Sequence, residues 1–386
     1  MCLASPRASS FLPHRVVREL AAAVASPVKK AIRGGRSIYA GQVLSFGVTI
    51  LPDPPWQRLV ELMKLAEESG FDYGWTYDSH VLWQEPYPLL TLAAMNTERI
   101  KLGLNVTNPG TREPTVTASA FATLQDVSNG RMVMGIGRGD SARRVIGQKP
   151  VRVADFEAAC AMLRDLMNGR PVRWNDTDIE LAWAKGRPEI PLYVAGYGPR
   201  VLAIAGRVAD GVIIQLADPE IVEWIVGQVR AAAEEAGRDP DALKVVACAP
   251  AHVGDDLADA CEQVRWFPAM VSNHVFDVLS RHDPADLPSA LTEYVTRMQR
   301  ERYDYSEHSR VGAKHGEQIT DETCDRFCIL GPPEAHVEKL RRLEAAGVDQ
   351  WNIYLMTHGQ EETLRAYGET IIPALAAGPA QPAPPG

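Results

Sequence analysis

From Ser45 onward, hydrophobic and polar positions alternate between two periods, which predicts strands and helices in turn. Short β-branched runs indicate buried strands, and apolar residues spaced three and four apart indicate amphipathic helices. The predicted strands are Ser45–Leu51, Asp72–Tyr77, Ile100–Thr107, Arg131–Ile136, Pro191–Ala195, Gly211–Gln215, Lys244–Val253 and Gln350–Leu355. The predicted helices are Trp56–Ser69, Pro88–Asn96, Thr115–Val127, Val153–Met167, Val201–Arg207, Glu220–Ala236 and Glu334–Ala346. Eight repeated β–α units favour an α/β fold with a parallel sheet closed into a (β/α)8 TIM barrel.

A glycine-rich segment follows the fourth predicted strand. Gly135, Gly137 and Gly139 alternate along it, and Arg138 lies between the last two. Glycines let a ligand approach the backbone and its N–H donors, and an arginine suits a phosphate or a carboxylate. By itself the pattern fits a tight strand exit without a ligand equally well. A Rossmann fold is disfavoured, because its glycine motif follows the first strand.

The residues that follow the strands form the candidate site, because active sites of (β/α)8 barrels lie at the carboxyl ends of the strands. After the fifth strand, Pro199 begins a helix whose N-terminus is a ready anion site. Two backbone-donor segments on adjacent strand ends suit one phosphorylated cofactor. The candidate cofactor-binding residues are Asn105, Val106, Thr107, Gly137, Arg138, Gly139, Asp140, Ala195, Gly196, Tyr197, Gly198 and Gln215, and the candidate catalytic residues are Asp78, Ser79 and His80.

The composition is that of an ordinary globular enzyme. The chain has 386 residues, of which 46% are hydrophobic, and its net charge of -9 disfavours a nucleic-acid partner. The six cysteines are scattered, and Cys324 and Cys328 have no second pair at metal spacing. No apolar run approaches the roughly 20 residues that span a bilayer. These features predict a reduced, cytoplasmic protein without a metal site or a membrane contact.

Three segments depart from the strand–helix rhythm and delimit a barrel domain over residues 45–375. Residues 1–44 carry seven basic residues against Glu19 alone, which predicts a disordered arm or upstream sequence read through from an early start codon, with a targeting segment as the alternative. The tail, 376–386, is predicted to be disordered. Residues 266–319, near the seventh strand, are longer than a barrel connection requires, and their aromatic content favours an ordered insertion over the barrel mouth.

Several of these segments together resemble the luciferase-like family of flavin- and deazaflavin-dependent oxidoreductases. The resemblance is closest to the branch similar to methylene-tetrahydromethanopterin reductase, which uses coenzyme F420. It implies a (β/α)8 barrel with an extra segment near the seventh strand, and a non-prolyl cis peptide bond after the third strand, here Asn105–Val106. The matching stretches are Ser69-Gly70-Phe71-Asp72 running into Trp75-Thr76-Tyr77-Asp78, Lys101-Leu102-Gly103, Gly130-Arg131 through Gly139, and Pro191-Leu192-Tyr193-Val194-Ala195-Gly196.

The end of the second strand departs from the family pattern. Family members commonly carry an acid followed by a histidine there, whereas this chain has Asp78-Ser79-His80. In an extended segment the extra residue turns His80 to the opposite face. Asp78 is therefore the stronger candidate for the proton donor or acceptor, with Ser79 orienting it or a water molecule, and His80 is the weaker candidate for a general acid.

The resemblance implies an oxidoreductase that transfers hydride between coenzyme F420 and a small organic substrate, with the redox chemistry supplied by the cofactor. Two alternatives stay open. One is an FMN-dependent luciferase-like monooxygenase, which needs a dry pocket for a flavin–oxygen adduct. The other is a non-catalytic flavin-binding protein, against which the polar strand ends at Asp78, Asn105 and Gln215 weigh. We expect a homo-oligomer, namely a dimer.

Overall fold

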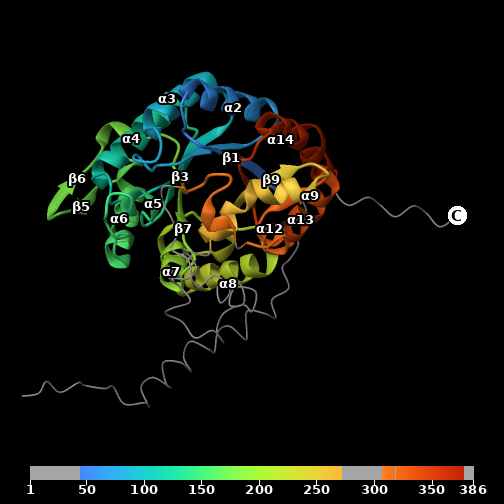
Figure 1. Cartoon of the computed structure of the whole chain (residues 1–386). Helices are drawn as coiled ribbons and strands as arrows, with labels where there is room; N and C mark the ends of the chain where they lie inside the picture. The colour runs from blue at the N-terminus through green and yellow to red at the C-terminus, as the bar shows by residue number, and fades with distance from the viewer. Residues whose placement is uncertain (1–43, 272–306, 318, 378–386) are drawn as a thin grey trace, which may run out of the picture. The chain divides into compact units, whose positions relative to one another are not determined.

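The computed structural model describes residues 44–271, 307–317 and 319–377, and its strands close into a barrel (Figure 1). The parallel barrel strands are β1 (Ser45–Ile50), β2 (Tyr73–Thr76), β3 (Lys101–Thr107), β4 (Met132–Ile136), β7 (Leu192–Ala195), β8 (Gly211–Ile214), β9 (Lys244–Val253) and β11 (Gln350–Tyr354). They pair in this order, and the pairing of β11 with β1 closes the ring. The predicted (β/α)8 barrel is confirmed.

Helices surround the strands (Figure 1). In α2, Leu59, Leu62, Met63 and Ala66 are buried at the spacing of one helical face. The principal helices are α2 (Trp56–Glu68), α3 (Pro86–Asn96), α4 (Pro114–Val127), α6 (Val153–Leu166), α7 (Pro199–Val208), α8 (Pro219–Glu235), α13 (Pro333–Ala345) and α14 (Gln360–Ala366). The other α-helices of the described residues are α5 (Ser141–Arg144), α9 (Leu257–Val264), α12 (Asp321–Phe327) and α15 (Ile372–Ala376).

Three short strands were not predicted. The strands β5 (Val172–Trp174) and β6 (Thr177–Ile179) form an antiparallel hairpin at the edge of the ring, after α6 (Figure 1). Its turn residues, Asn175 and Asp176, are both left-handed, with φ of 46° and 60°. The strand β10 (Ile329–Gly331) pairs with the carboxyl end of β9. Strands of this length are too short to produce a detectable hydrophobic period.

Trp75 fills the interior of the barrel. Its side chain is 1% exposed and stacks on Tyr73 with a centroid distance of 5.9 Å. Gly103, on the neighbouring strand, makes room for it: a Cβ there would lie 2.7 Å from Trp75 Cζ3 and 2.2 Å from the Val133 carbonyl oxygen. Close packing of the interior therefore explains this glycine, which is part of the Lys101-Leu102-Gly103 motif.

The insertion follows the seventh barrel strand, β9, as expected. Trp266 and Phe267, directly after α9, are buried, and residues 307–317 precede α12. The centre of the insertion, 272–306, and the two terminal segments, 1–43 and 378–386, lie outside the described residues, so the expectations for them stay predictions. The expected tail boundary is corrected by one residue, because α15 continues through Ala376.

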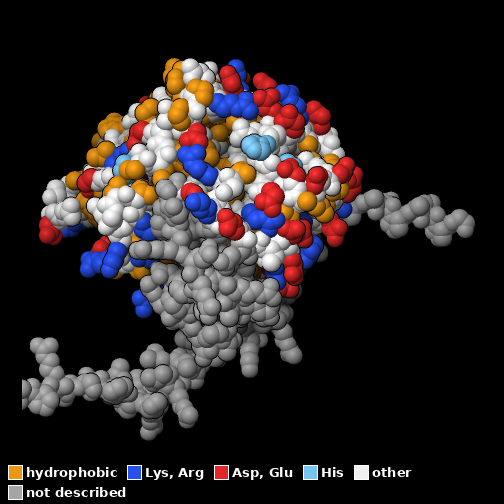
Figure 2. Space-filling view, viewed as in Figure 1, with side chains coloured by type: hydrophobic (Ala, Val, Ile, Leu, Met, Phe, Trp, Pro, Cys, Tyr) orange, Lys and Arg blue, Asp and Glu red, His pale blue; other side chains and the backbone are white. Residues whose placement is uncertain are grey.

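The surface of the described part mixes charges of both signs. Figure 2 shows acidic and basic side chains interspersed over the face in view. The helices described here include none that is long and apolar enough to cross a membrane.

Inside the molecule, five cysteines are buried free thiols: Cys160, Cys248, Cys261, Cys324 and Cys328.

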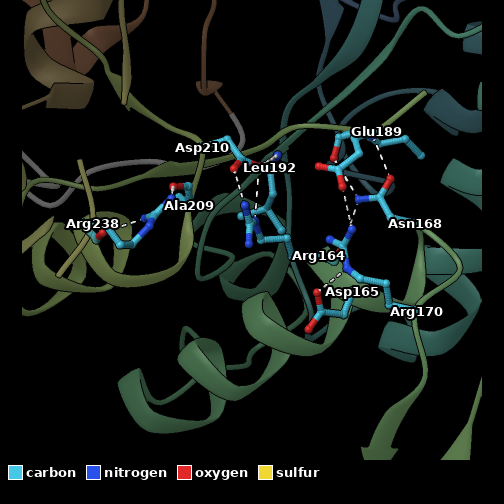
Figure 3. A network of polar contacts seen from close by, with 11 residues as sticks. Arg164, Asp165, Asn168, Arg170, Glu189, Leu192, Ala209, Asp210 and Arg238 are labelled. Atoms are coloured by element: carbon cyan, nitrogen blue, oxygen red, sulfur yellow. Dashed lines mark hydrogen bonds and ion pairs between the residues drawn. The ribbon is translucent and has the colours of Figure 1, made fainter. Parts of the chain in front are cut away.

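An ion-pair network joins α6 to the start of β7 and to the residue before β8 (Figure 3). Arg164 Nη2 donates to Asp210 Oδ1 at 2.7 Å, and Asp210 Oδ2 accepts the Leu192 N–H at 3.0 Å. Close by, Arg170 pairs with both Asp165 and Glu189 at 2.7 Å. Within this network, Asp210 therefore links the charge of Arg164 to the backbone of the barrel.

We expect Asp210→Ala to lower the free energy of unfolding by about 1–2 kcal/mol, because it leaves the Leu192 N–H and the Arg164 guanidinium without their acceptor. Asp165→Ala is the matched control. Its carboxylate is 46% exposed and pairs with Arg170 at the surface, so its loss should cost less than about 1 kcal/mol. Urea unfolding of both variants, followed by circular dichroism, measures the difference, and equal losses would contradict this account.

Candidate active site

The carboxyl ends of the barrel strands enclose a cavity of about 330 Å³, within the usual size of small-molecule sites. Every candidate site residue except His80 lines it. The wall also contains residues that were not predicted, among them Trp83, Asn108, Ser141, Arg144, Arg200, Met270 and His308. Arg200 lies in the predicted glycine–helix motif and could have been named, whereas Met270 and His308 come from the insertion and had no such signal.

His80 lies outside the cavity. Its side chain is exposed because the chain leaves the extended conformation at His80, which begins a turn, whereas Asp78 and Ser79 before it are both buried. Its charge still acts on the site from a distance, because a protonated His80 favours the ionised form of Asp78 and lowers the pKa of that carboxyl. The position of His80 therefore does not support contact with a ligand in the cavity.

Asp78 is a buried carboxyl group at the end of β2. It is 4% exposed, and burial raises its pKa, partly offset by a hydrogen bond from Thr107 and by the charge of Arg112. Thr107 Oγ1 donates to Asp78 Oδ2 at 2.6 Å, and Arg112 Nη1 lies 3.7 Å from the same oxygen. Both contacts fix one carboxylate oxygen, which leaves Oδ1 to face a ligand.

The hydroxyl groups of Thr107 and Ser79 make hydrogen bonds other than those expected. Thr107, a candidate cofactor contact, is the residue that hydrogen bonds Asp78. Ser79, expected to orient Asp78, instead shares a hydrogen bond of 2.9 Å with Ser141. This contact ties the end of β2 to α5, on the side of the glycine segment.

The glycine segment and the start of α7 form one wall of the cavity. Arg138 is fixed there, since its Nε donates to the Val151 carbonyl oxygen at 2.6 Å and its own carbonyl accepts the Val151 N–H at 2.9 Å. Gly139 is left-handed, with φ of 78°, which favours glycine at this turn. Asp140 pairs with Arg144.

One expectation about this wall needs correction. The N–H of Gly137 was expected to face a ligand, but it donates to the Thr107 carbonyl oxygen at 2.8 Å. The remaining candidates for anion binding are Arg138 and the first turn of α7, where Gly198, Pro199 and Arg200 line the cavity. Pro199 has no N–H, and the Val201 N–H donates to the Gly198 carbonyl oxygen at 2.8 Å, so the backbone donors that this turn can offer a ligand are the N–H groups of Gly198 and Arg200.

The amide side chains of Asn105 and Gln215 also line the cavity. Asn105 Nδ2 donates to Thr49 Oγ1 at 3.2 Å, while Gln215 Nε2 donates to Tyr354 Oη at 2.7 Å and Gln215 Oε1 accepts from Tyr197 at 3.1 Å. The Asn105–Val106 peptide bond is cis, as expected.

The described residues contain no cluster of three or more His, Cys, Asp or Glu side chains that could hold a metal ion.

The site thus joins a wall that carries Arg138 and a helix N-terminus to a buried carboxyl group that holds a proton more readily than a free aspartate. Such an arrangement can bind a phosphorylated cofactor at one wall and exchange a proton with a second molecule at the other.

Comparison with known proteins agrees with this geometry. A family model described as luciferase-like monooxygenase matches residues 32–350. The chain belongs to this family. The 5,10-methylenetetrahydromethanopterin reductase of Methanolobus tindarius is 32% identical over 80% of this chain and 93% of its own. The F420-dependent glucose-6-phosphate dehydrogenase of Microbacterium testaceum is 28% identical over 82% and 93%.

A solved structure of the family has the same fold. The coenzyme F420-dependent tetrahydromethanopterin reductase of Methanopyrus kandleri superposes with a TM-score of 0.70 and 26% identity, covering 86% of this chain and 99% of that one. The resemblance inferred from the strand-end motifs of this luciferase-like chain is therefore confirmed.

Proposed function

We propose that this luciferase-like protein is an oxidoreductase that transfers hydride between coenzyme F420 and a small organic substrate. One observation carries the proposal: a single cavity combines the buried Asp78 carboxyl with a wall suited to a phosphorylated cofactor. Relatives that are named for coenzyme F420 match this chain over most of both lengths, which favours that cofactor.

The residues of the cavity fit a phosphorylated deazaflavin. Arg138 and the N-terminus of α7 would hold its phosphate, and the cavity between Asn105 and Gln215 would hold its ring. When bound, the deazaflavin supplies hydride donation or acceptance. The chain itself binds and orients the reactants, and Asp78 Oδ1 gives or takes the accompanying proton.

We expect coenzyme F420 to bind more tightly than FMN. A deazaflavin carries carbon where a flavin has N5, so it passes hydride and reacts poorly with oxygen, and the site then needs a proton partner but no oxygen pocket. Fluorescence titration of the purified protein with each cofactor measures the two affinities. Turnover is then tested with 5,10-methylenetetrahydromethanopterin and with glucose 6-phosphate. A yellow preparation that holds FMN and consumes oxygen with substrate would contradict the proposal.

We also propose that the enzyme is cytoplasmic and dimeric. Five buried free thiols support a reducing compartment. Size-exclusion chromatography with light scattering tests the dimer.

A further inference from the structure

A histidine of the insertion lies in the cavity from which His80 is missing. His308 is 7% exposed and lines the cavity together with Asp78 and Ser79. Its ring lies 5.9 Å from that of Trp83, with the planes inclined by 44°. Trp83 is itself fixed to the end of β2, because its backbone N–H donates to the Ser79 carbonyl oxygen at 3.0 Å. The insertion thus brings an imidazole to the proton-handling end of the site.

The backbone next to His308 is held in an uncommon conformation. Ser309 is left-handed, with φ of 57°, and only 2% exposed. Non-glycine residues keep such a conformation where their surroundings over-determine it, and they cluster at functional sites. Nearby, the Glu307 carboxylate accepts the Lys314 N–H at 2.9 Å, which closes the turn that carries His308.

The segment that leads from His308 back to the barrel is also anchored. Arg265, at the end of α9, donates to the Ile319 carbonyl oxygen at 2.5 Å and pairs with Asp321 at 2.6 Å. These contacts join the two ends of the insertion to each other. The end of the insertion that follows His308 is therefore anchored to the end of α9.

We propose that His308 is a ligand-contacting residue that hydrogen bonds the reacting oxygen or nitrogen of the substrate; this inference rests on the proposed function. When hydride reaches the substrate carbon, the electron pair of the C=O or C=N bond moves to the heteroatom. That atom takes the proton from Asp78, while the N–H of His308 stabilises its developing negative charge. In the reverse direction the proton returns to Asp78. The substrate class is therefore a carbonyl or imine compound, or the corresponding alcohol or amine.

Chemical modification tests the position of His308 without a known substrate. Diethyl pyrocarbonate acylates accessible neutral imidazoles, and peptide mass spectrometry reports each histidine separately. We expect His308 to react in the free protein and to be slowed about tenfold by coenzyme F420 at ten times its dissociation constant. His80, exposed and outside the cavity, is the control whose rate should not change, and His336, 0% exposed, should stay unmodified throughout.

The same samples separate the failure of this inference from that of the proposed function, because cofactor fluorescence reports F420 binding independently. If F420 does not bind, the proposed function fails, and the reactivity of His308 relative to His336 still decides whether the imidazole faces the cavity. A His308 as unreactive as His336, or one modified equally fast with F420 bound, overturns the inference.

Two variants test the hydrogen bond itself. His308→Phe keeps a ring against Trp83 but removes the donor, whereas His308→Gln keeps an N–H. Both should bind F420 like the wild type. In the turnover assay, we expect His308→Phe to lose about tenfold, the worth of one hydrogen bond, and His308→Gln to recover part of it. Wild-type turnover in His308→Phe would contradict the proposed contact.

Discussion

Replacing Asp78 by Asn is expected to lower kcat by about 10²–10⁴-fold, the usual contribution of general acid–base catalysis. The amide occupies the same volume and can still accept the hydrogen bond from Thr107, but it cannot exchange a proton at Oδ1. Steady-state kinetics with the substrate found in the turnover screen measure kcat, and fluorescence titration measures F420 affinity, which should stay unchanged.

His80→Ala is the matched control for Asp78→Asn, since His80 is the neighbouring titratable side chain and lies outside the cavity. It should lose less turnover. An Asp78→Asn enzyme with normal kcat, or a His80→Ala enzyme that loses as much, would show that the proton comes from another group.

The hydrogen bond from Thr107 gives a pH test of the same carboxyl group. This bond lowers the pKa of Asp78 against the larger effect of burial, which raises it. Thr107→Val should therefore raise the pKa further. Reduction of the substrate needs protonated Asp78 and declines as pH rises through that pKa, so in the variant the decline should move to higher pH. A profile of kcat against pH that does not move would contradict the assignment.

The barrel could be predicted from sequence because its strands and helices are long enough to show their periods. Short strands such as β10 carry no such signal. The strands β5 and β6 are equally short, but the turn between them left a signal of another kind, because Asn175 and Asp176 are residue types that tolerate the left-handed conformation of a two-residue hairpin turn.

In the active site, prediction succeeded where a residue's place follows from its strand. Asp78, Asn105 and Gln215 lie within two residues of the carboxyl ends of barrel strands, so one end of the barrel brings them together. The hydrogen-bond partners of these residues depend on side-chain rotamers and on tertiary packing. For this reason the Ser79–Ser141 contact and the engagement of Gly137 with Thr107 could not be predicted. His308 arrives through the insertion, for which no period or motif fixed a position.

Replacing Arg138 by Ala is expected to weaken F420 binding by about 1.5–3 kcal/mol, or roughly 10–150-fold, the range for hydrogen bonds to a charged group. The hydrogen bond from its Nε to the Val151 carbonyl oxygen holds the guanidinium at the cavity wall before any ligand arrives, and the Val151 N–H fixes the Arg138 backbone carbonyl. Little ordering entropy is then lost on binding. Fluorescence titration measures the affinity. Arg207→Ala, in the last turn of α7 and outside the cavity, should leave it unchanged.

A deazaflavin that lacks the phosphate distinguishes two effects of the Arg138 substitution: the loss of the positive charge and a change in the shape of the cavity wall. If Arg138 acts on the phosphate, Arg138→Ala and the wild type should bind this phosphate-free compound equally well, although they differ for coenzyme F420. Arg138→Lys keeps the charge but not the planar fork of donors, so its F420 affinity should lie between the two. Equal F420 affinity in wild type and Arg138→Ala would show that the phosphate lies elsewhere, whereas equal losses for both compounds would mean that the substitution had distorted the wall.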